Sequence, residues 1–141
     1  MKLLIDTNVV LDVLLKREPF YKAATDVLNL TQRDDVREYI SASAVTDIYY
    51  IAHRQLKDKA TVKELLKRLF MVVSVAAVSE HEIASALDLA WSDFEDSVQY
   101  SVALLNEMDG LVTRNPTDYV DADIAIWEPK QILQKLSTED N

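Results

Sequence analysis

The sequence contains no cysteine, one glycine and three prolines in 141 residues. Without cysteine there can be no disulfide, no zinc–thiolate site and no thiol nucleophile, which fits a reducing cytoplasm. A single glycine cannot supply the glycine-rich loops that cradle phosphates in P-loop and dinucleotide-binding proteins. So few glycines and prolines also predict long regular elements joined by short connections.

Long hydrophobic runs are missing as well. Lys2 is followed by only three apolar residues before Asp6, so we expect no signal peptide. No apolar run is long enough to cross a membrane, which predicts a cytoplasmic protein with no membrane contact. Hydrophobic residues nevertheless make up 49% of the chain, which predicts one packed domain over residues 1–141, with a frayed polar tail over 137–141.

Positive charge is also scarce, since the formal net charge is −9. Proteins that hold nucleic acid by their overall charge are basic, so this value argues against binding of that kind. It suits a basic partner, or acidic groups that hold metal ions. Lys59, Lys63 and Lys67 share one helix face and either contact phosphates or form a solvated surface.

Short apolar runs alternate with segments of helical periodicity along the whole chain. Strands are predicted over five ranges: 2–5, 36–40, 71–75, 110–113 and 124–126. Ser43 is a predicted N-cap, and the pairs Thr61/Glu64 and Ser79/Glu82 have the spacing of capping boxes. Strands separated by helices predict an α/β fold, a three-layer α/β/α sandwich around a mostly parallel sheet.

The first strand ends in polar residues, because Leu3-Leu4-Ile5 is followed by Asp6-Thr7-Asn8. Ligands of open α/β sheets bind at the carboxyl ends of strands. Asp6 therefore either faces such a crevice or only caps the next helix. Because other acids also lie at element ends, we expect Asp6 to face the crevice and any capping to fall to Thr7.

Those other acids are Asp47, Asp93, Asp96 and Asp118. Carboxylates drawn into one crevice repel each other unless a cation neutralises them. Oxygen ligands without His or Cys favour Mg²⁺ or Mn²⁺, and such an ion can activate water against a phosphate ester.

Several of these acids also have a structural interpretation. Asp93 and Asp96 have the spacing of an N-cap and the third helical residue, where acids offset the helix dipole. Asp118 could be an ordinary turn acid. Glu95 is expected to point away from Asp96, into solvent.

Four blocks of the sequence resemble the PIN domain, a metal-dependent nuclease fold found in many bacterial toxins of toxin–antitoxin pairs. The blocks are 3–8, 40–50 around Asp47, 93–97 around Asp96, and 112–119. The second block has Asp47 where the family usually has Glu. The fourth has Asn115 where many members have Asp, so Asp118 is the candidate there.

The resemblance implies a five-stranded parallel sheet of order 3-2-1-4-5 and an endoribonuclease dependent on Mg²⁺ or Mn²⁺. The implied catalytic and metal-binding residues are Asp6, Asp47, Asp96 and Asp118. The implied supporting residues are Asn8, Asp93, Thr113, Arg114 and Asn115. Among these, Asn8 and Thr113 would orient the carboxylates, and Asn115 would reach a metal-bound water or a substrate phosphate.

The same resemblance implies three partners: an RNA substrate, an antitoxin protein and a second copy of the chain. Two alternatives remain open. Asn115 and the negative net charge also suit a non-catalytic PIN-like module that binds RNA or protein. A strand ending in Asp6-Thr7-Asn8 also resembles the nucleophile strand of haloacid-dehalogenase-like phosphatases, although that family wants a second Asp where Asn8 stands.

Overall fold

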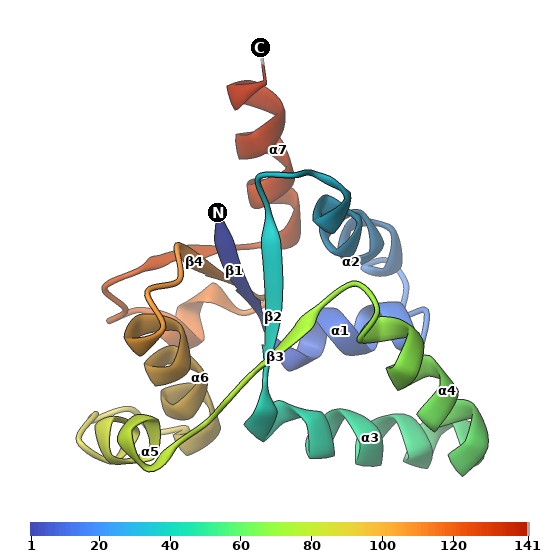
Figure 1. Cartoon of the computed structure of the whole chain (residues 1–141), viewed down its shortest axis with the longest axis horizontal. Coiled ribbons are helices and arrows are strands. Elements are labelled where there is room, and N and C mark those ends of the chain that lie inside the picture. Colours follow the sequence, from blue (N-terminus) through green and yellow to red (C-terminus); the bar gives the residue numbers. More distant parts are fainter. Residues whose placement is uncertain (141) are drawn as a thin grey trace.

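The computed structural model describes residues 1–140, and these residues fold around a five-stranded, entirely parallel sheet (Figure 1). The strands are β1 (Lys2–Ile5), β2 (Arg37–Ser41), β3 (Ser74–Ala76), β4 (Gly110–Val112) and β5 (Ala125–Trp127). Their order is β3-β2-β1-β4-β5, which confirms the expected topology. β1 and β4 are therefore neighbours at the point where the strand order reverses, and Ile5 is aligned with Val112.

Helices cover both faces of the sheet. They are α1 (Thr7–Leu14), α2 (Tyr21–Leu28), α3 (Ala42–Leu56), α4 (Lys59–Leu69), α5 (Glu80–Leu87), α6 (Phe94–Leu105) and α7 (Pro129–Glu139), with short 3₁₀ helices η1 (Asn29–Gln32) and η2 (Pro116–Tyr119). In Figure 1 the helices α1 to α4 lie on one side of the sheet, and α5 and α6 lie on the other. Helix α7 packs against α2. The predicted three-layer sandwich is confirmed.

The central strand β1 is buried on both faces. Leu3 and Ile5 point into one apolar core with α1 to α4, whereas Leu4 points into a second core with α6. All three side chains are completely buried. A strand covered on both sides must be apolar at every position, which explains the unbroken run before Asp6.

Two helix starts differ from the prediction. Helix α3 is capped by Ser41, whose hydroxyl accepts from the Ser43 backbone N–H at 3.3 Å. Helix α4 is capped by Asp58 rather than Thr61, and its carboxylate accepts from the Ala60 N–H at 3.1 Å. In both cases an oxygen two or three residues upstream reaches the free N–H groups first. The capping box of Ser79 and Glu82 at the start of α5 is confirmed.

The third strand begins later than predicted, at Ser74 instead of residue 71. The Met71 N–H donates to the Arg68 carbonyl at 3.1 Å, and the Val73 N–H donates to the Leu69 carbonyl at 3.0 Å. These amides complete the end of α4, so they do not join the sheet.

The C-terminal segment, which was predicted to be a frayed polar tail, is largely helical. Helix α7 continues through Glu139, and both carboxylate oxygens of Asp140 accept from Arg33, at 2.7 and 3.0 Å. Residue 141 lies outside the described residues. No helix among residues 1–140 is both long enough and apolar enough to cross a membrane.

Candidate active site

Asp6 leaves the carboxyl end of β1 with only 6% of its surface exposed. Its Oδ1 accepts from the Thr7 backbone N–H at 2.7 Å, so Asp6 itself is the N-cap of α1, not Thr7 as expected. The same oxygen accepts from the Gln99 side-chain amide, which reaches over from α6, at 2.8 Å. Asp6 thus caps α1 and faces α6 at the same time.

The second oxygen of Asp6 faces the segment that follows β4. Oδ2 accepts from the Thr113 hydroxyl at 2.7 Å, the Tyr119 hydroxyl at 3.3 Å and the Asn8 amide at 3.4 Å. Thr113 is fully buried and follows β4 directly, so the pairing of β1 with β4 sets this contact. A carboxylate offers about four acceptor sites, and five donors surround the two oxygens of Asp6, so some of these donors share a site.

Asp96 shares a hydrogen-bond donor with Asp6. The Tyr119 hydroxyl lies 3.2 Å from Asp96 Oδ1 and 3.3 Å from Asp6 Oδ2, so it lies between the two carboxylates. Burial, followed by the charges of Asp93 and Asp6, raises the pKa of Asp96 to about 6. Burial and the two carboxylates also hold the pKa of Tyr119 far above its usual range, so its hydroxyl remains a donor.

Neither Gln99 nor Tyr119 was predicted from the sequence. Gln99 lies three residues after Asp96, which places both side chains on one face of α6. Tyr119 follows Asp118 and is 1% exposed. The helical spacing could have identified Gln99, whereas Tyr119 looked like an ordinary apolar position.

Asp47 and Glu95 form a second acidic pair, where α3 contacts α6. Burial, followed by the charge of the Asp47 carboxyl and a hydrogen bond with it, raises the pKa of Glu95 to about 7. Asp93 and Asp6 also contribute to this shift. Glu95 is exposed, as expected, but α3 also brings Asp47 against it.

Asp93 and Asp118 flank Asp96. Asp93 caps α6 by accepting from the Asp96 backbone N–H at 3.0 Å, as the spacing predicted. Asp118 lies exposed in η2, and its charge contributes to the raised pKa of Asp96. These three acids line one side of a hollow of about 490 Å³. The hollow gives solvent access to the carboxylates.

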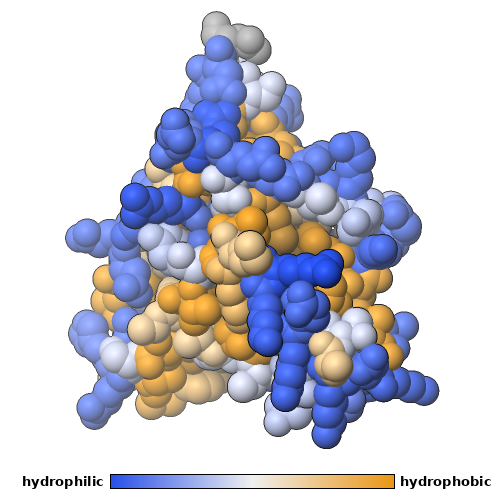
Figure 2. Space-filling view, turned by 45° about the vertical axis from the view of Figure 1, so that its right-hand side comes forward, coloured by the Kyte–Doolittle hydropathy of each residue, from blue (hydrophilic) through white to orange (hydrophobic). Residues whose placement is uncertain are grey.

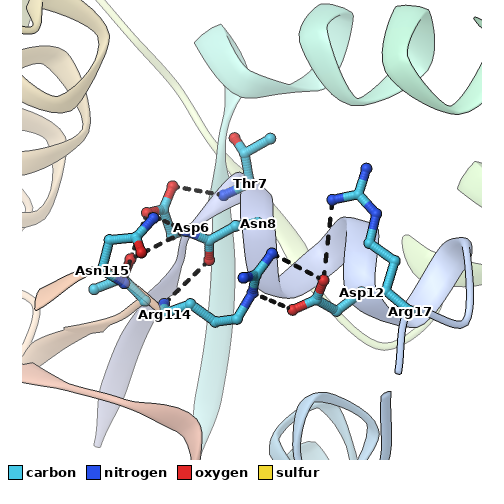
Figure 3. Close-up of polar contacts among 8 residues, drawn as sticks. Asp6, Thr7, Asn8, Asp12, Arg17, Arg114 and Asn115 are labelled. Atoms are coloured by element: carbon cyan, nitrogen blue, oxygen red, sulfur yellow. Dashed lines mark hydrogen bonds and ion pairs between the residues drawn. The ribbon is translucent and has the colours of Figure 1, made fainter. Parts of the chain in front are cut away.

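Arg114 and Asn115 connect the acidic cluster to α1 (Figure 3). The Arg114 backbone N–H donates to Asn8 Oδ1 at 3.2 Å, and the Asn115 backbone N–H donates to the Thr113 hydroxyl at 3.1 Å. Asn8 also donates to Asp6, so it joins the two segments that carry the site. The Asn115 residue is exposed.

The Arg114 side chain is held by Asp12, a residue that was not predicted from the sequence. Arg114 Nε and Nη2 donate to the two Asp12 oxygens at 2.6 and 3.3 Å, and Arg17 lies 4.0 Å away on the other side (Figure 3). Asp12 is completely buried, and burial raises its pKa while Arg114 opposes the rise. A single acid inside an apolar helix signals such a partner, because an unpaired buried charge is costly.

The chemistry of these residues fits a divalent cation. Mutual repulsion contributes to the raised pKa values of Glu95 and Asp96, and a cation among the carboxylates would offset it. An all-oxygen donor set suits Mg²⁺ or Mn²⁺. Among residues 1–140, however, no three acidic or histidine side chains are arranged around one common point for a metal. Some side chains must therefore move before three of them can bind a single ion.

A family model of the PIN domain matches residues 2–117. This range covers most of the chain, and the chain belongs to the PIN domain family. Members of this family generally use divalent metal ions. A search of functionally curated proteins finds no significant match.

Solved structures of toxin–antitoxin proteins share this fold at low sequence identity. VapBC-1 from nontypeable Haemophilus influenzae has a TM-score of 0.72 and 16% identity, covering 92% of this chain and 99% of that chain. VapBC2 from Rickettsia felis, bound to a promoter DNA fragment, has a TM-score of 0.69 and 17% identity, covering 91% and 98%. VapC20 from Mycobacterium tuberculosis, a toxin that cleaves the sarcin–ricin loop, has a TM-score of 0.67 and 12% identity, covering 84% and 94%.

Proposed function

We propose that this protein is an endoribonuclease that depends on Mg²⁺ or Mn²⁺ and acts as the toxin of a toxin–antitoxin pair. The observation that carries the proposal is the buried Asp6, which shares the Tyr119 hydroxyl with Asp96 at the carboxyl ends of β1 and β4. Asp6, Asp47 and Asp96 would hold the ion, with Asp118 assisting directly or through a water. The PIN family and the RNA-cleaving VapC20 support RNA as the substrate.

When bound, the ion would supply an activated water and neutralise charge on the phosphoryl group. The protein's own residues position the ligands. Gln99 and Thr113 each hold one oxygen of Asp6 from a different element, which fixes the plane of the carboxylate. Asn8 supports the same carboxylate and the Arg114 backbone. The exposed Asn115 side chain would hydrogen-bond a phosphate of the substrate.

The proposal is tested by replacing Asp6 or Asp96 with Asn, which keeps the shape and removes the charge. We expect each variant to lose Mn²⁺-dependent cleavage of a labelled RNA by at least about 100-fold, because the ion loses a charged ligand. The matched control is Asp34→Asn, since Asp34 is an exposed loop acid. Circular dichroism melting verifies folding. If both variants cleave the RNA at the wild-type rate, the site is wrongly assigned.

A non-catalytic PIN-like module is the second candidate. It is favoured by Asn115 at a position where many members have an acid, and by the lack of a three-ligand arrangement among residues 1–140. Isothermal titration with Mn²⁺ separates the two candidates, because a nuclease of this kind binds the ion and an inert module does not at millimolar levels. The phosphatase alternative fits less well, because the position where that family wants a second Asp carries Asn8, whose amide donates to Asp6.

We also propose a second copy of the chain and an antitoxin as partners, in the cytoplasm. Apolar side chains are exposed beside the edge strand β3, where Met71 is 83%, Val72 50% and Val75 46% exposed. Exposed apolar surface at a sheet edge commonly marks a contact with another protein. Figure 2 shows apolar side chains across the middle and lower left of one face, while hydrophilic side chains surround the C-terminal end at the top. Light scattering after size-exclusion chromatography would measure the mass of the purified chain and detect a dimer.

A further inference from the structure

A second hollow, of about 440 Å³, lies beside the candidate active site. Ligand pockets commonly measure about 300–1,000 Å³. Arg114 and Asn115 line this hollow, while Thr117 and Asp118 line the acidic one, so a single short segment borders both. The remaining wall combines apolar and charged residues: Pro19, Phe20, Ala23, Pro129, Lys130 and Glu128.

The hollow contains an aromatic surface with a fixed cation. Phe20 is 39% exposed, and the Arg114 guanidinium lies over its ring, 3.9 Å from the ring centre. Arg114 is itself held by both oxygens of the buried Asp12. The pair is therefore positioned before any ligand arrives. Aromatic rings and arginine guanidinium groups are the surfaces on which unpaired nucleobases stack.

Two cationic side chains line the hollow, although the chain as a whole has a formal net charge of −9. They are Arg114, which is paired with the buried Asp12, and Lys130, and the hollow is also lined by the carboxylate of Glu128. The Arg114 backbone contacts Asn8, which contacts Asp6, so the segment that lines the hollow is hydrogen-bonded to the acidic cluster. The same short segment, from Arg114 to Asp118, leads from one hollow to the other.

We propose that this hollow binds one unpaired nucleotide of the RNA substrate, adjacent to the phosphate that is cleaved. Its base stacks on Phe20, and its phosphate lies near Lys130 and Arg114. The inference rests on the proposed ribonuclease function for the identity of the ligand. It adds a requirement for a single-stranded nucleotide at one defined position, because a base inside a duplex cannot reach the ring.

The test measures binding rather than cleavage. Short fluorescent single-stranded oligoribonucleotides, each with one abasic position, are titrated with protein in EDTA at low salt, and anisotropy is recorded. The wild-type protein should lose affinity when one particular position is abasic, by roughly 5- to 150-fold, the range for stacking of one base. Phe20→Ala should bind the intact RNA more weakly by a similar factor and should not respond to the abasic position.

Two further variants separate stacking from folding. Phe20→Leu keeps an apolar contact with the Arg114 guanidinium but removes the aromatic face, so it should behave like Phe20→Ala and melt like the wild type. Phe20→Trp should still bind the intact RNA more tightly than the RNA with the abasic position. The control is Leu87→Ala, which removes an exposed apolar side chain from α5 and should bind like the wild type. Lys130→Gln should weaken binding, unlike Lys135→Gln on the same helix.

The inference is overturned if wild-type protein does not bind the RNA, or if it binds every abasic RNA equally well. It is also overturned if Phe20→Ala binds like wild type, as expected if the hollow holds a protein partner instead. These outcomes are independent of catalysis. If Asp6→Asn abolishes cleavage but Phe20→Ala binds normally, only the nucleotide pocket fails. If one abasic position weakens binding to the wild type but not to Phe20→Ala, and yet no RNA is cleaved, only the enzymatic proposal fails.

Discussion

The Tyr119 hydroxyl has one proton and two carboxylate acceptors, Asp6 at 3.3 Å and Asp96 at 3.2 Å. Both distances are long for an O–H···O hydrogen bond, as expected when one donor is shared. The hydroxyl reduces the repulsion between two acids that would otherwise face each other. Asp6 has further donors in Thr113 and Gln99, whereas Asp96 depends more strongly on Tyr119.

Removing this hydroxyl in Tyr119→Phe should destabilise the metal-free protein by about 1.5–3 kcal/mol, the usual value of a hydrogen bond to a charged group. The variant should in turn gain more stability from Mn²⁺ than wild type does, because Asp6 Oδ2 loses one of its three donors and the repulsion between Asp6 and Asp96 is greater. Thermal unfolding with and without Mn²⁺ measures both effects. Tyr50→Phe, on the exposed surface of α3, is the control. Equal Mn²⁺ stabilisation of variant and wild type would contradict this role.

Residues whose position follows from local sequence could be predicted, and residues that act across the fold could not. Asp6 ends a strand and Thr113 follows the neighbouring strand, so their contact follows from the predicted strand order. Asp12 and Tyr119 occupy positions that look apolar in the sequence, and their polar partners come from segments about a hundred residues and twenty-three residues away, respectively. Periodicity detects burial but does not identify the partner of a buried polar group.

At the scale of the element, the position of Thr113 depends on how β4 pairs with β5. Gly110 begins β4, and a Cβ at this position would collide with the Trp127 ring and lie 2.8 Å from the Ala125 carbonyl oxygen. The only glycine of the chain therefore permits close approach of the edge strand. The Trp127 carbonyl in turn accepts from the Thr113 N–H at 2.9 Å.

Gly110→Ala should push Trp127 away and destabilise the protein by about 1–3 kcal/mol, as overpacking of a core does. The shift should also loosen Thr113 and weaken RNA cleavage beyond the loss explained by unfolding. Urea denaturation measures the stability, and cleavage is assayed where both proteins remain folded. Ala84→Ser on the exposed side of α5 should change stability by less than about 0.5 kcal/mol. If Gly110→Ala is as stable as the wild type, β5 can move away from β4 without a loss of stability.

The elements themselves were predictable because both faces of the sheet are covered. The central strands β1 and β4 therefore read as short apolar runs, and the helices show apolar stripes. Element boundaries were less predictable: Ser41 and Asp58 cap their helices ahead of the residues expected from spacing. Several oxygens near a helix start compete for the same N–H groups, and tertiary packing decides which one binds.

At the scale of the whole molecule, the proposed function requires an acidic protein to bind a polyanion. The net charge of −9 repels RNA at long range, and salt screens this repulsion. Locally, Arg114 and Lys130 line the hollow next to the acidic site. Lys59, Lys63 and Lys67 lie exposed along α4, which packs against α3, and their role stays a prediction. Attraction therefore depends on local cations and on any ion held by the carboxylates.

The stability of the whole molecule should depend on pH through a residue far from this chemistry. Glu38 on β2 is 2% exposed, and neither carboxyl oxygen has a hydrogen-bond partner among residues 1–140. Burial alone raises its pKa from 4.5 to about 8. Well below pH 4.5 Glu38 is protonated in both the folded and the unfolded chain, so its ionisation does not affect the free energy of unfolding there. As the pH rises towards 8 the unfolded chain loses this proton first, and stability falls by about 1.4 kcal/mol for each unit of pKa difference.

Glu38→Gln removes this titration, so its advantage over wild type should grow from pH 5 to pH 8 and then level off. Urea denaturation across this range measures the difference in the free energy of unfolding. Glu80→Gln, which changes an exposed acid at the start of α5, should track the wild-type curve at a constant offset over the same range. Parallel curves for Glu38→Gln and wild type would mean that the carboxyl ionises in the folded protein as easily as in the unfolded chain. The opposite slope would require an unidentified cation beside Glu38, since such a partner would lower its pKa.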